Sequence, residues 1–422
     1  MAAIDIELPQ AEPAESAGRS FHPWTVVLGS ALALAFGAVP ILQYTSGLFM
    51  APLQKEFGWN RVELSLGISS VQLISMVSVF FVGWAMDRWG IKRVIAPLIA
   101  LFATNVALMA TMNSLAMYVT LYALFGVTST GLNPVGFMKS ISAYVHERRG
   151  LAMGVALSGT ALGAAIVPRF AEYMIAAHGW RHAYLALALL PALVALPSVL
   201  IFLREPEGSR SRVRDGRRAK REPLDELPGL TMGEALVTRS FWLLALAIFL
   251  VSAVLNGTIA HAVPFLVDHG YSAAAAASVL SGVGLASVAG RICSGTLFDR
   301  FFAPHVAVAF FLLCIAGLFL LANLKSAEIA MICVGLTLGF ELDMVGYLVP
   351  RYFGLRKFGQ IYGLLFGALN AGGAVGPLAM GAAYTLWGSY EFAFVSFGLM
   401  LLVACAMVIG LPAYPYGILR RH

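Results

Sequence analysis

Four ionisable side chains stand inside long apolar stretches of this 422-residue chain, namely Arg291, Glu341, Asp343 and His261. A charged side chain in the lipid core costs at least about 3 kcal/mol on insertion scales, so each group is expected to face a water-filled cavity or a polar partner. The planar guanidinium of Arg291 matches a carboxylate through two parallel hydrogen bonds. A carboxyl within a membrane can carry a proton. These residue types therefore indicate recognition of an anion together with movement of a proton.

The two carboxyls are two positions apart on one predicted helix, so they point about 200° away from each other. Only one of them can face a central cavity, and we favour Asp343 over Glu341 as the proton or counter-ion site. A structural ion pair between Arg291 and either carboxyl remains the alternative. His261 is a third candidate for proton coupling, although a lone histidine in a span more often hydrogen-bonds a neighbouring helix.

Uncharged polar side chains in the same stretches supply candidate hydrogen bonds to a solute. They are Tyr44, Gln72, Asn133, Asn256 and Asn370, with Gln43 next to Tyr44. Each of them could equally bind a neighbouring helix, where such a hydrogen bond contributes about 0.6 kcal/mol. Both roles stay open for every member of the set.

The elements that must position these side chains are predicted to be membrane-spanning helices. Hydrophobic residues make up 59% of the chain, charged residues 12%, and the mean hydropathy is +0.81. A soluble domain carries about a quarter charged residues, so too few polar groups are present to cover a water-soluble globule. Lipid offers the backbone no hydrogen-bond partners, and each crossing segment is therefore expected to be a helix of about 20 residues. The fold class is an all-α integral membrane protein.

Twelve apolar runs predict twelve transmembrane helices. The runs cover 24–49, 62–86, 94–112, 115–138, 150–175, 181–203, 240–266, 273–298, 304–323, 327–350, 358–383 and 390–411. A long basic segment after the sixth run divides the chain into two six-helix bundles. The predicted organisation is a disordered cytoplasmic tail at 1–22, an N-terminal bundle at 23–203, a cytoplasmic linker at 204–239, a C-terminal bundle at 240–411 and a cytoplasmic tail at 412–422.

The distribution of positive charge predicts which side of the membrane each loop occupies. With both termini inside, most of the 28 lysines and arginines, including those of the linker, fall on the cytoplasmic side. Lys55, Arg61, Arg181 and Lys325 fall on the opposite side. Positive charge accumulates in the cytoplasmic loops of membrane proteins, so both termini are expected to be cytoplasmic.

The two predicted halves repeat each other. At an offset of 209 residues, Gly126, Gly150, Gly154, Gly163, Pro168 and Gly179 align with Gly335, Gly359, Gly363, Gly372, Pro377 and Gly388. Duplicated six-helix halves imply a pseudo-two-fold axis along the membrane normal, with a binding site near the midplane between them.

Other chemistries lack their sequence signatures. There is no phosphate-binding Gly-Lys-Ser/Thr loop to support drive by ATP hydrolysis. Cys293, Cys314, Cys333 and Cys405 lie in apolar runs without metal-ligand spacing, as small packing residues do. The basic linker fits a loop that sets topology or contacts anionic lipid rather than nucleic acid. The first 22 residues have no apolar core, so no cleavable signal peptide is expected. We predict no enzyme activity, no cofactor and no metal.

A loop motif joins the predicted second and third helices. It reads Gly83-Trp84-Ala85-Met86-Asp87-Arg88-Trp89-Gly90-Ile91-Lys92-Arg93, and Gly295-Thr296-Leu297-Phe298-Asp299-Arg300 repeats its first part. The motif resembles the loop 2–3 signature of the major facilitator superfamily. That resemblance implies two pseudo-symmetric bundles working by alternating access, and a cytoplasmic gate motif made of Gly83, Asp87, Arg88, Gly90, Asp299 and Arg300. Ile91 replaces the usual basic residue, which implies a weaker gate contact.

Further segments narrow the resemblance. The segments 57–65, 351–354 and 358–363, together with Gly290-Arg291, are similar to the bacterial monocarboxylate-transporter and oxalate/formate-antiporter branch. In that branch the helix 8 arginine binds the substrate carboxylate, and the resemblance carries this role to Arg291. Ser287 replaces an acidic residue of animal monocarboxylate transporters, and Leu369 replaces the second cation of the oxalate carrier. One intramembrane cation favours a substrate with one carboxylate, although Arg169, next to Glu172 in helix 5, keeps a dianion open.

We therefore expect a secondary active transporter of a small organic anion, with a monocarboxylate favoured, driven by proton symport or anion exchange. It is expected to act as a monomer in a bacterial inner membrane, with a proton or counter-anion and membrane lipid as further partners. Two alternatives stay open. A drug or cation exporter would need Glu341 or Asp343 and tolerate loss of the Arg291 charge. A non-transporting sensor with the same fold would bind solute without moving it.

Overall fold

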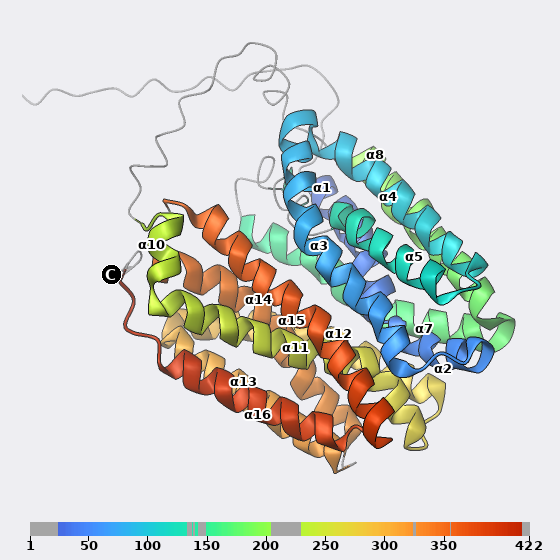
Figure 1. Cartoon of the computed structure of the whole chain (residues 1–422). Coiled ribbons are helices and arrows are strands. Elements are labelled where there is room, and N and C mark those ends of the chain that lie inside the picture. Colours follow the sequence, from blue (N-terminus) through green and yellow to red (C-terminus); the bar gives the residue numbers. More distant parts are fainter. Residues whose placement is uncertain are drawn as a thin grey trace, which may run out of the picture.

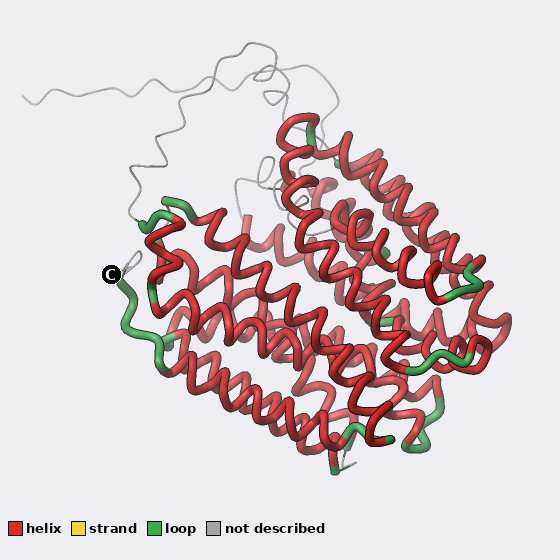
Figure 2. Tube along the Cα trace, in the orientation of Figure 1, coloured by secondary structure: helices red, strands yellow, loops and turns green. Residues whose placement is uncertain are grey.

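The computed structural model describes residues 24–132, 137, 140–141, 149–203, 229–323, 326–354 and 356–415. Within these residues every extended regular element is a helix (Figure 2). Eleven helical segments in the described part are long and apolar enough to cross a membrane. The chain is therefore an all-helical membrane protein, as its composition predicted.

The helices are arranged as two groups (Figure 1). The first, called the N-half, contains α1 (Trp24–Ala35), η1 (Val39–Gln43), α2 (Ser46–Phe57), α3 (Arg61–Trp89), α4 (Ile91–Leu108), η2 (Met109–Thr111), α5 (Leu115–Thr128), η3 (Ser129–Leu132), α7 (Arg149–Leu190), η4 (Pro191–Ala195) and α8 (Leu196–Phe202). The second, called the C-half, contains α10 (Met232–Val237), α11 (Arg239–Asp268), α12 (Ala273–Arg300), α13 (Ala303–Ala322), α14 (Ala327–Phe353), α15 (Phe358–Trp387) and α16 (Glu391–Ile409). α10 lies in the segment predicted as linker.

Two ends of the molecule are named for use below. The linker end is where α8 ends and α10 begins, and the far end is where α2 passes into α3 and α11 passes into α12.

The halves pack together mainly through α3 against α15 and α7 against α12. A Cβ added at Gly284 of α12 would lie 2.2 Å from the Cβ of Ala164 in α7, so glycine allows this close contact between the halves.

The fifth and sixth predicted spans follow each other with almost no connecting loop. α7 covers the fifth span and the first part of the sixth, and its two helical parts meet at a break at Gly179, whose φ of 84° lies in the left-handed region that glycine adopts without strain. The two spans therefore count as one among the eleven segments. The boundaries of most other spans differ from the prediction by a few residues.

The first predicted span is interrupted rather than continuous. α1 ends at Ala35, a single π-helical turn carrying Pro40 follows, and α2 starts at Ser46. Proline has no amide hydrogen to donate, so it weakens the helical ladder at this point. Tyr44 is the residue directly after the π turn, at its C-terminal cap position. The break places this tyrosine where the two halves meet.

The start of α3 is fixed by local sequence. The Asn60 side chain accepts a hydrogen bond from the Glu63 amide, and the Glu63 side chain accepts one from the Asn60 amide. This reciprocal capping box defines the first helical turn. Arg61 is consequently the first residue of α3 and stands at the far end of the molecule.

Candidate functional site

A cavity of about 460 Å³ lies between the two halves and is called the central cavity. α1, η1, η3 and α7 line it from the N-half, and α12 lines it from the C-half. Its polar side chains are those of Tyr44, Ser158, Thr160, Ser287 and Arg291. The other lining residues are Leu34, Val39, Leu132, Gly154, Val155, Leu157, Ala161, Val288 and Ile292. The cavity therefore combines a mostly apolar wall with one guanidinium.

Arg291 is half-buried and reaches this cavity from α12. Tyr44, Asp343 and Tyr362 each interact electrostatically with it, and Tyr44 also interacts with the Ser287 side chain. The Asp343 Oδ2 accepts a hydrogen bond from the Ser294 hydroxyl at 2.8 Å. The structure thus brings together Arg291, predicted to bind the anion, Tyr44, predicted to hydrogen-bond the solute, and Asp343, predicted to carry a proton.

Glycines in two helices produce this arrangement. A Cβ at Gly339 of α14 would lie 1.8 Å from the Ser287 carbonyl oxygen, and a Cβ at Gly290 of α12 would lie 2.0 Å from the Leu336 carbonyl oxygen. Neither position has room for a larger residue while the backbones stay in place. α12 and α14 therefore touch through their backbones, which brings Arg291 close to Asp343.

Glu341 points elsewhere, as the helical spacing predicted. Its side chain is buried inside the C-half, where it interacts with Ser252 of α11 and Cys314 of α13. Its Oε1 atom is buried and makes no hydrogen bond to any described residue. Glu341 therefore belongs to the interior of one half, whereas Asp343 belongs to the surroundings of Arg291.

The predicted amide side chains fall into different places. The Gln72 and Gln43 Nε2 atoms of the N-half lie 3.4 and 3.5 Å from the Asn256 Oδ1 of the C-half. These contacts join the halves near the middle of the molecule. Asn370 is buried and donates to the Phe366 carbonyl of its own helix at 2.8 Å. Asn133 lies outside the described residues.

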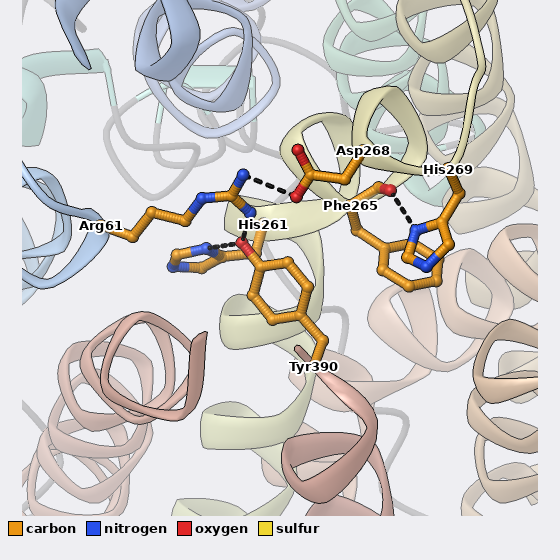
Figure 3. A network of polar contacts seen from close by, with 6 residues as sticks. All are labelled: Arg61, His261, Phe265, Asp268, His269 and Tyr390. Carbon is orange, nitrogen blue, oxygen red and sulfur yellow. Dashed lines mark hydrogen bonds and ion pairs between the residues drawn. The ribbon is translucent and has the colours of Figure 1, made fainter. Parts of the chain in front are cut away.

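His261 is fully buried in α11 and does not line the central cavity. Its Nδ1 lies 2.9 Å from the Tyr390 hydroxyl (Figure 3), and its Nε2 lies 3.0 Å from the Ser65 hydroxyl and 3.1 Å from the Pro377 carbonyl. Ser65 belongs to the N-half, whereas the other two belong to the C-half. His261 therefore connects the halves.

Arg61 joins the same group, although the sequence placed it just outside a predicted span, on the side opposite the cytoplasm. It is only 6% exposed, its Nη2 donates to the Asp268 Oδ2 at 2.6 Å, and its Nη1 donates to the Tyr390 hydroxyl (Figure 3). Its guanidinium carbon also lies 3.6 Å from the centre of the Tyr384 ring. The available signal was an arginine placed directly after a helix-capping asparagine, which fixes it at a helix end but not against a partner.

The gate motif is described only in part. The side chains of Asp87 and Asp299 lie outside the described set. A Cβ at Gly83 would meet no atom within 4 Å, Arg88 lies 5.4 Å over the Trp84 ring, and Gly90 has a φ of 95°. Gly83 therefore makes no close contact with another helix in the described part of the chain. Arg300 is exposed at the end of α12.

Comparison with known proteins identifies the architecture. Residues 31–364 match the family profile of the Major Facilitator Superfamily. The chain belongs to this superfamily. The solved structure of a bacterial homologue of the human lysosomal transporter Spinster, in an inward-facing and occupied conformation, superposes with a TM-score of 0.68. That alignment covers 92% of this chain and 97% of the other at 16% identity, which supports the fold.

Two curated relatives resemble the chain along most of its length. A probable nitrate/nitrite transporter NarK2 of Mycobacterium tuberculosis is 28% identical over 377 residues, which cover 84% of this chain and 87% of the relative. Monocarboxylate transporter 13 of Bos taurus is 27% identical over 407 residues, which cover 93% of this chain and 89% of the relative. The membership establishes a membrane transporter family.

Proposed function

We propose that this chain is a secondary active transporter of a small organic anion, and specifically of a monocarboxylate. The observation that carries the proposal is the Arg291 guanidinium in a cavity between the two halves. Among the described residues the ion pairs are Arg61 with Asp268 and Arg181 with Glu56, and Arg291 belongs to neither. Its planar donors therefore remain available for a carboxylate.

The relatives support an anionic substrate from a separate direction. The names of the two curated relatives refer to nitrate or nitrite and to monocarboxylates, which are all anions.

The charge distribution supports one orientation of the molecule in the membrane. We place the linker end in the cytoplasm of a bacterial cell, because the basic residues are concentrated there.

The lining of the central cavity supports a substrate with an apolar body. Apart from Arg291, the cavity wall is made mainly of aliphatic side chains. The other polar side chains are those of Tyr44, Ser158, Thr160 and Ser287. The volume of about 460 Å³ exceeds what a two- or three-carbon acid fills. Branched or aromatic monocarboxylates should therefore be carried better than formate, oxalate or nitrate.

Asp343 supplies the coupling step of the proposal. Asp343 interacts electrostatically with Arg291, so its carboxylate competes with a substrate carboxylate for the guanidinium. An ionised Asp343 balances the charge of Arg291 when the cavity is empty. When a carboxylate binds Arg291, a proton taken up by Asp343 keeps the net charge of the site unchanged. Substrate and proton would then cross together.

Uptake into proteoliposomes tests the proposal. Radiolabelled formate, lactate, a branched acid, benzoate and oxalate are each offered with and without an inward proton gradient. We expect gradient-stimulated uptake of the monocarboxylates, and a loss of at least about a hundredfold in Arg291→Gln, because a buried charged contact is removed. Arg181→Gln, which changes an exposed arginine outside the cavity, is the matched control and should keep full uptake.

Two results would overturn this function. Retained carboxylate uptake in Arg291→Gln would remove Arg291 from the site. Cation efflux that needs Glu341 or Asp343 but tolerates Arg291→Gln would identify an exporter of the opposite charge class instead.

A further inference from the structure

The hydrogen bonds around His261 form a closed ring with a defined direction. Arg61 can only donate, so the Tyr390 oxygen accepts from it. The Pro377 carbonyl can only accept, so the His261 Nε2 must carry a hydrogen. Ser65 already donates its hydroxyl hydrogen to the Arg61 carbonyl at 2.7 Å, so towards the imidazole it is an acceptor as well.

The remaining bond fixes the charge of the imidazole. With hydrogen on Nε2, a neutral His261 has a bare Nδ1, which accepts the Tyr390 hydroxyl hydrogen at 2.9 Å. The sequence of donation then runs from Arg61 to Tyr390, from Tyr390 to His261, and from His261 to Ser65 and Pro377. Every polar atom of the neutral imidazole is satisfied.

A second proton on His261 breaks this ring. A protonated Nδ1 would donate to the same Tyr390 oxygen that already accepts from Arg61, so two cations would share one hydroxyl. His261 is fully buried, where repulsion between like charges is screened little. The ring in its closed form therefore accommodates a neutral imidazole only.

The ring and the ion pair both cross the boundary between the halves at the far end. Arg61 and Ser65 belong to α3, whereas His261 and Asp268 belong to α11 and Tyr390 precedes α16. The backbones are also in close contact there, since a Cβ at Gly381 of α15 would lie 2.8 Å from the Arg61 carbonyl oxygen. Opening this end must separate all of these groups.

We propose that Arg61, Asp268, Tyr390 and His261 form a latch that closes the far end, and that protonation of His261 from the far side releases it. The inference rests on movement of the two halves and is independent of the carboxylate. It assigns the histidine a role in opening the gate, away from the central cavity.

The effect of His261 on the latch has to be distinguished from the effects of other charged or titratable side chains nearby. Among the described residues, Arg61 of α3 and Tyr390 at the start of α16 interact with His261, and Asp268 of α11 and Tyr384 of α15 lie next to these two side chains. Asp268 is partly exposed. His269 lies on the exposed rim, with its Nδ1 2.7 Å from the Phe265 carbonyl (Figure 3).

Distances between two spin labels measure the latch directly. Lys55→Cys in α2 and Ala274→Cys in α12 put labels on exposed positions of opposite halves at the far end. The background carries Cys293→Ser, because Cys293 is the exposed native cysteine and the other three are buried. Double electron–electron resonance on the full chain in nanodiscs, without substrate, then reports how far this end has opened.

Breaking the latch should open the far end. Asp268→Asn removes the charge that pairs with Arg61, and Tyr390→Phe removes the hydroxyl that joins Arg61 to His261. Both variants keep the side-chain shape, and we expect the ratio of long to short distances to rise about tenfold in each. Arg181→Gln is the matched control: it breaks a 2.6 Å arginine–carboxylate pair that lies within the N-half, so the distances should not change. Unchanged distances in both latch variants would overturn the latch.

The role of the proton has its own comparison. When the pH is lowered from about 8 to about 5.5 the unaltered latch should open, since a histidine released from the ring into water takes up a proton in this range, whereas the closed ring holds a neutral one. In His261→Gln the amide can accept from Tyr390 and donate to Pro377 without titrating, so the far end should stay closed throughout. His269→Gln should keep the full response. A pH response that survives in His261→Gln would assign the sensor to another group and overturn the role of His261.

The control pair suits this pH range. The Trp180 indole N–H and then the Arg181 guanidinium hydrogen-bond the Glu56 carboxylate and hold its pKa below the ordinary value. A carboxyl whose pKa is lowered keeps its charge until the pH falls through that lower value, so this pair remains formed while histidines titrate.

Discussion

At the scale of single residues, two arginines of this chain have opposite surroundings. Arg61 is held by a carboxylate, a hydroxyl and an aromatic face, which use its donors and its charge. Arg291 faces a cavity, with Asp343 nearby but no ion pair to any described residue. The first arrangement stabilises a conformation, and the second leaves a cation for a solute. Residue type alone does not distinguish these roles.

The proposed coupling makes a prediction at this scale. Asp343→Asn should abolish accumulation of substrate against its gradient, because the site can no longer exchange a proton. Exchange of labelled for unlabelled substrate should continue at a rate within about tenfold of the original, since Arg291 is intact. Both are measured in proteoliposomes.

Ser294→Ala provides the control for this variant. It removes the hydrogen bond to Asp343 but keeps the carboxyl, so proton-driven accumulation should persist. Proton-driven accumulation that survives in Asp343→Asn would exclude Asp343 as the coupling group.

At the scale of elements, the position of the site depends on how closely α12 and α14 approach. Glycines at 290 and 339 allow backbone contact, and this contact sets Arg291 beside Asp343. The broken first span has a comparable effect, because the π turn before Tyr44 places that side chain against Ser287. Helix breaks and small residues thus determine which polar groups meet.

Gly339→Ala tests the element-level argument. The added methyl group would lie 1.8 Å from the Ser287 carbonyl oxygen, so α12 must move away from α14. We expect a loss of about 1–3 kcal/mol in stability, as for overpacked cores, and a lower melting temperature in detergent. Carboxylate uptake should fall as well.

Gly346→Ala is the matched control in the same helix. A Cβ at Gly346 meets no atom of the described residues within 4 Å, and alanine favours a helix over glycine by about 0.5–1 kcal/mol. Its melting temperature should stay the same or rise. Equal destabilisation of the two variants would show that the backbone contact at Gly339 is not required.

At the scale of the whole molecule, the described hydrogen bonds between the halves run from the far end to the middle. They include Arg61 with Asp268, Ser65 with His261, Ser69 with the Ala374 carbonyl at 2.5 Å, and Gln72 with Asn256. The far end is therefore closed in this conformation. Alternating access requires that these contacts break while others form at the linker end.

The orientation of the molecule can be tested at this scale. With cytoplasmic termini, Lys55→Cys should react with a membrane-impermeant maleimide in intact cells, and Arg300→Cys should react only after the membrane is permeabilised. Both positions are exposed, and both variants carry Cys293→Ser. The reverse labelling pattern would place the linker end outside and the latch inside.

The sequence by itself determined the fold class, the approximate spans and the superfamily. These follow from hydropathy, charge distribution and local motifs, which are properties of neighbouring residues. It also singled out Arg291, Glu341, Asp343 and His261 as candidates, because a charge in an apolar run requires a special environment. The divergence of Glu341 from Asp343 followed from helical geometry alone.

Only the tertiary structure decided which polar groups meet. The latch joins Arg61 to residues 207 and 329 positions away, and its formation depends on the packing of two separate halves. Sequence reasoning placed Arg61 just outside a predicted span because charge and position at a helix end are equally compatible with exposure to water. Sequence reasoning named His261 as a candidate for proton coupling but could not name its hydrogen-bond partners. Those partners lie far away in the sequence, so only the folded structure shows which atoms are close enough to bond.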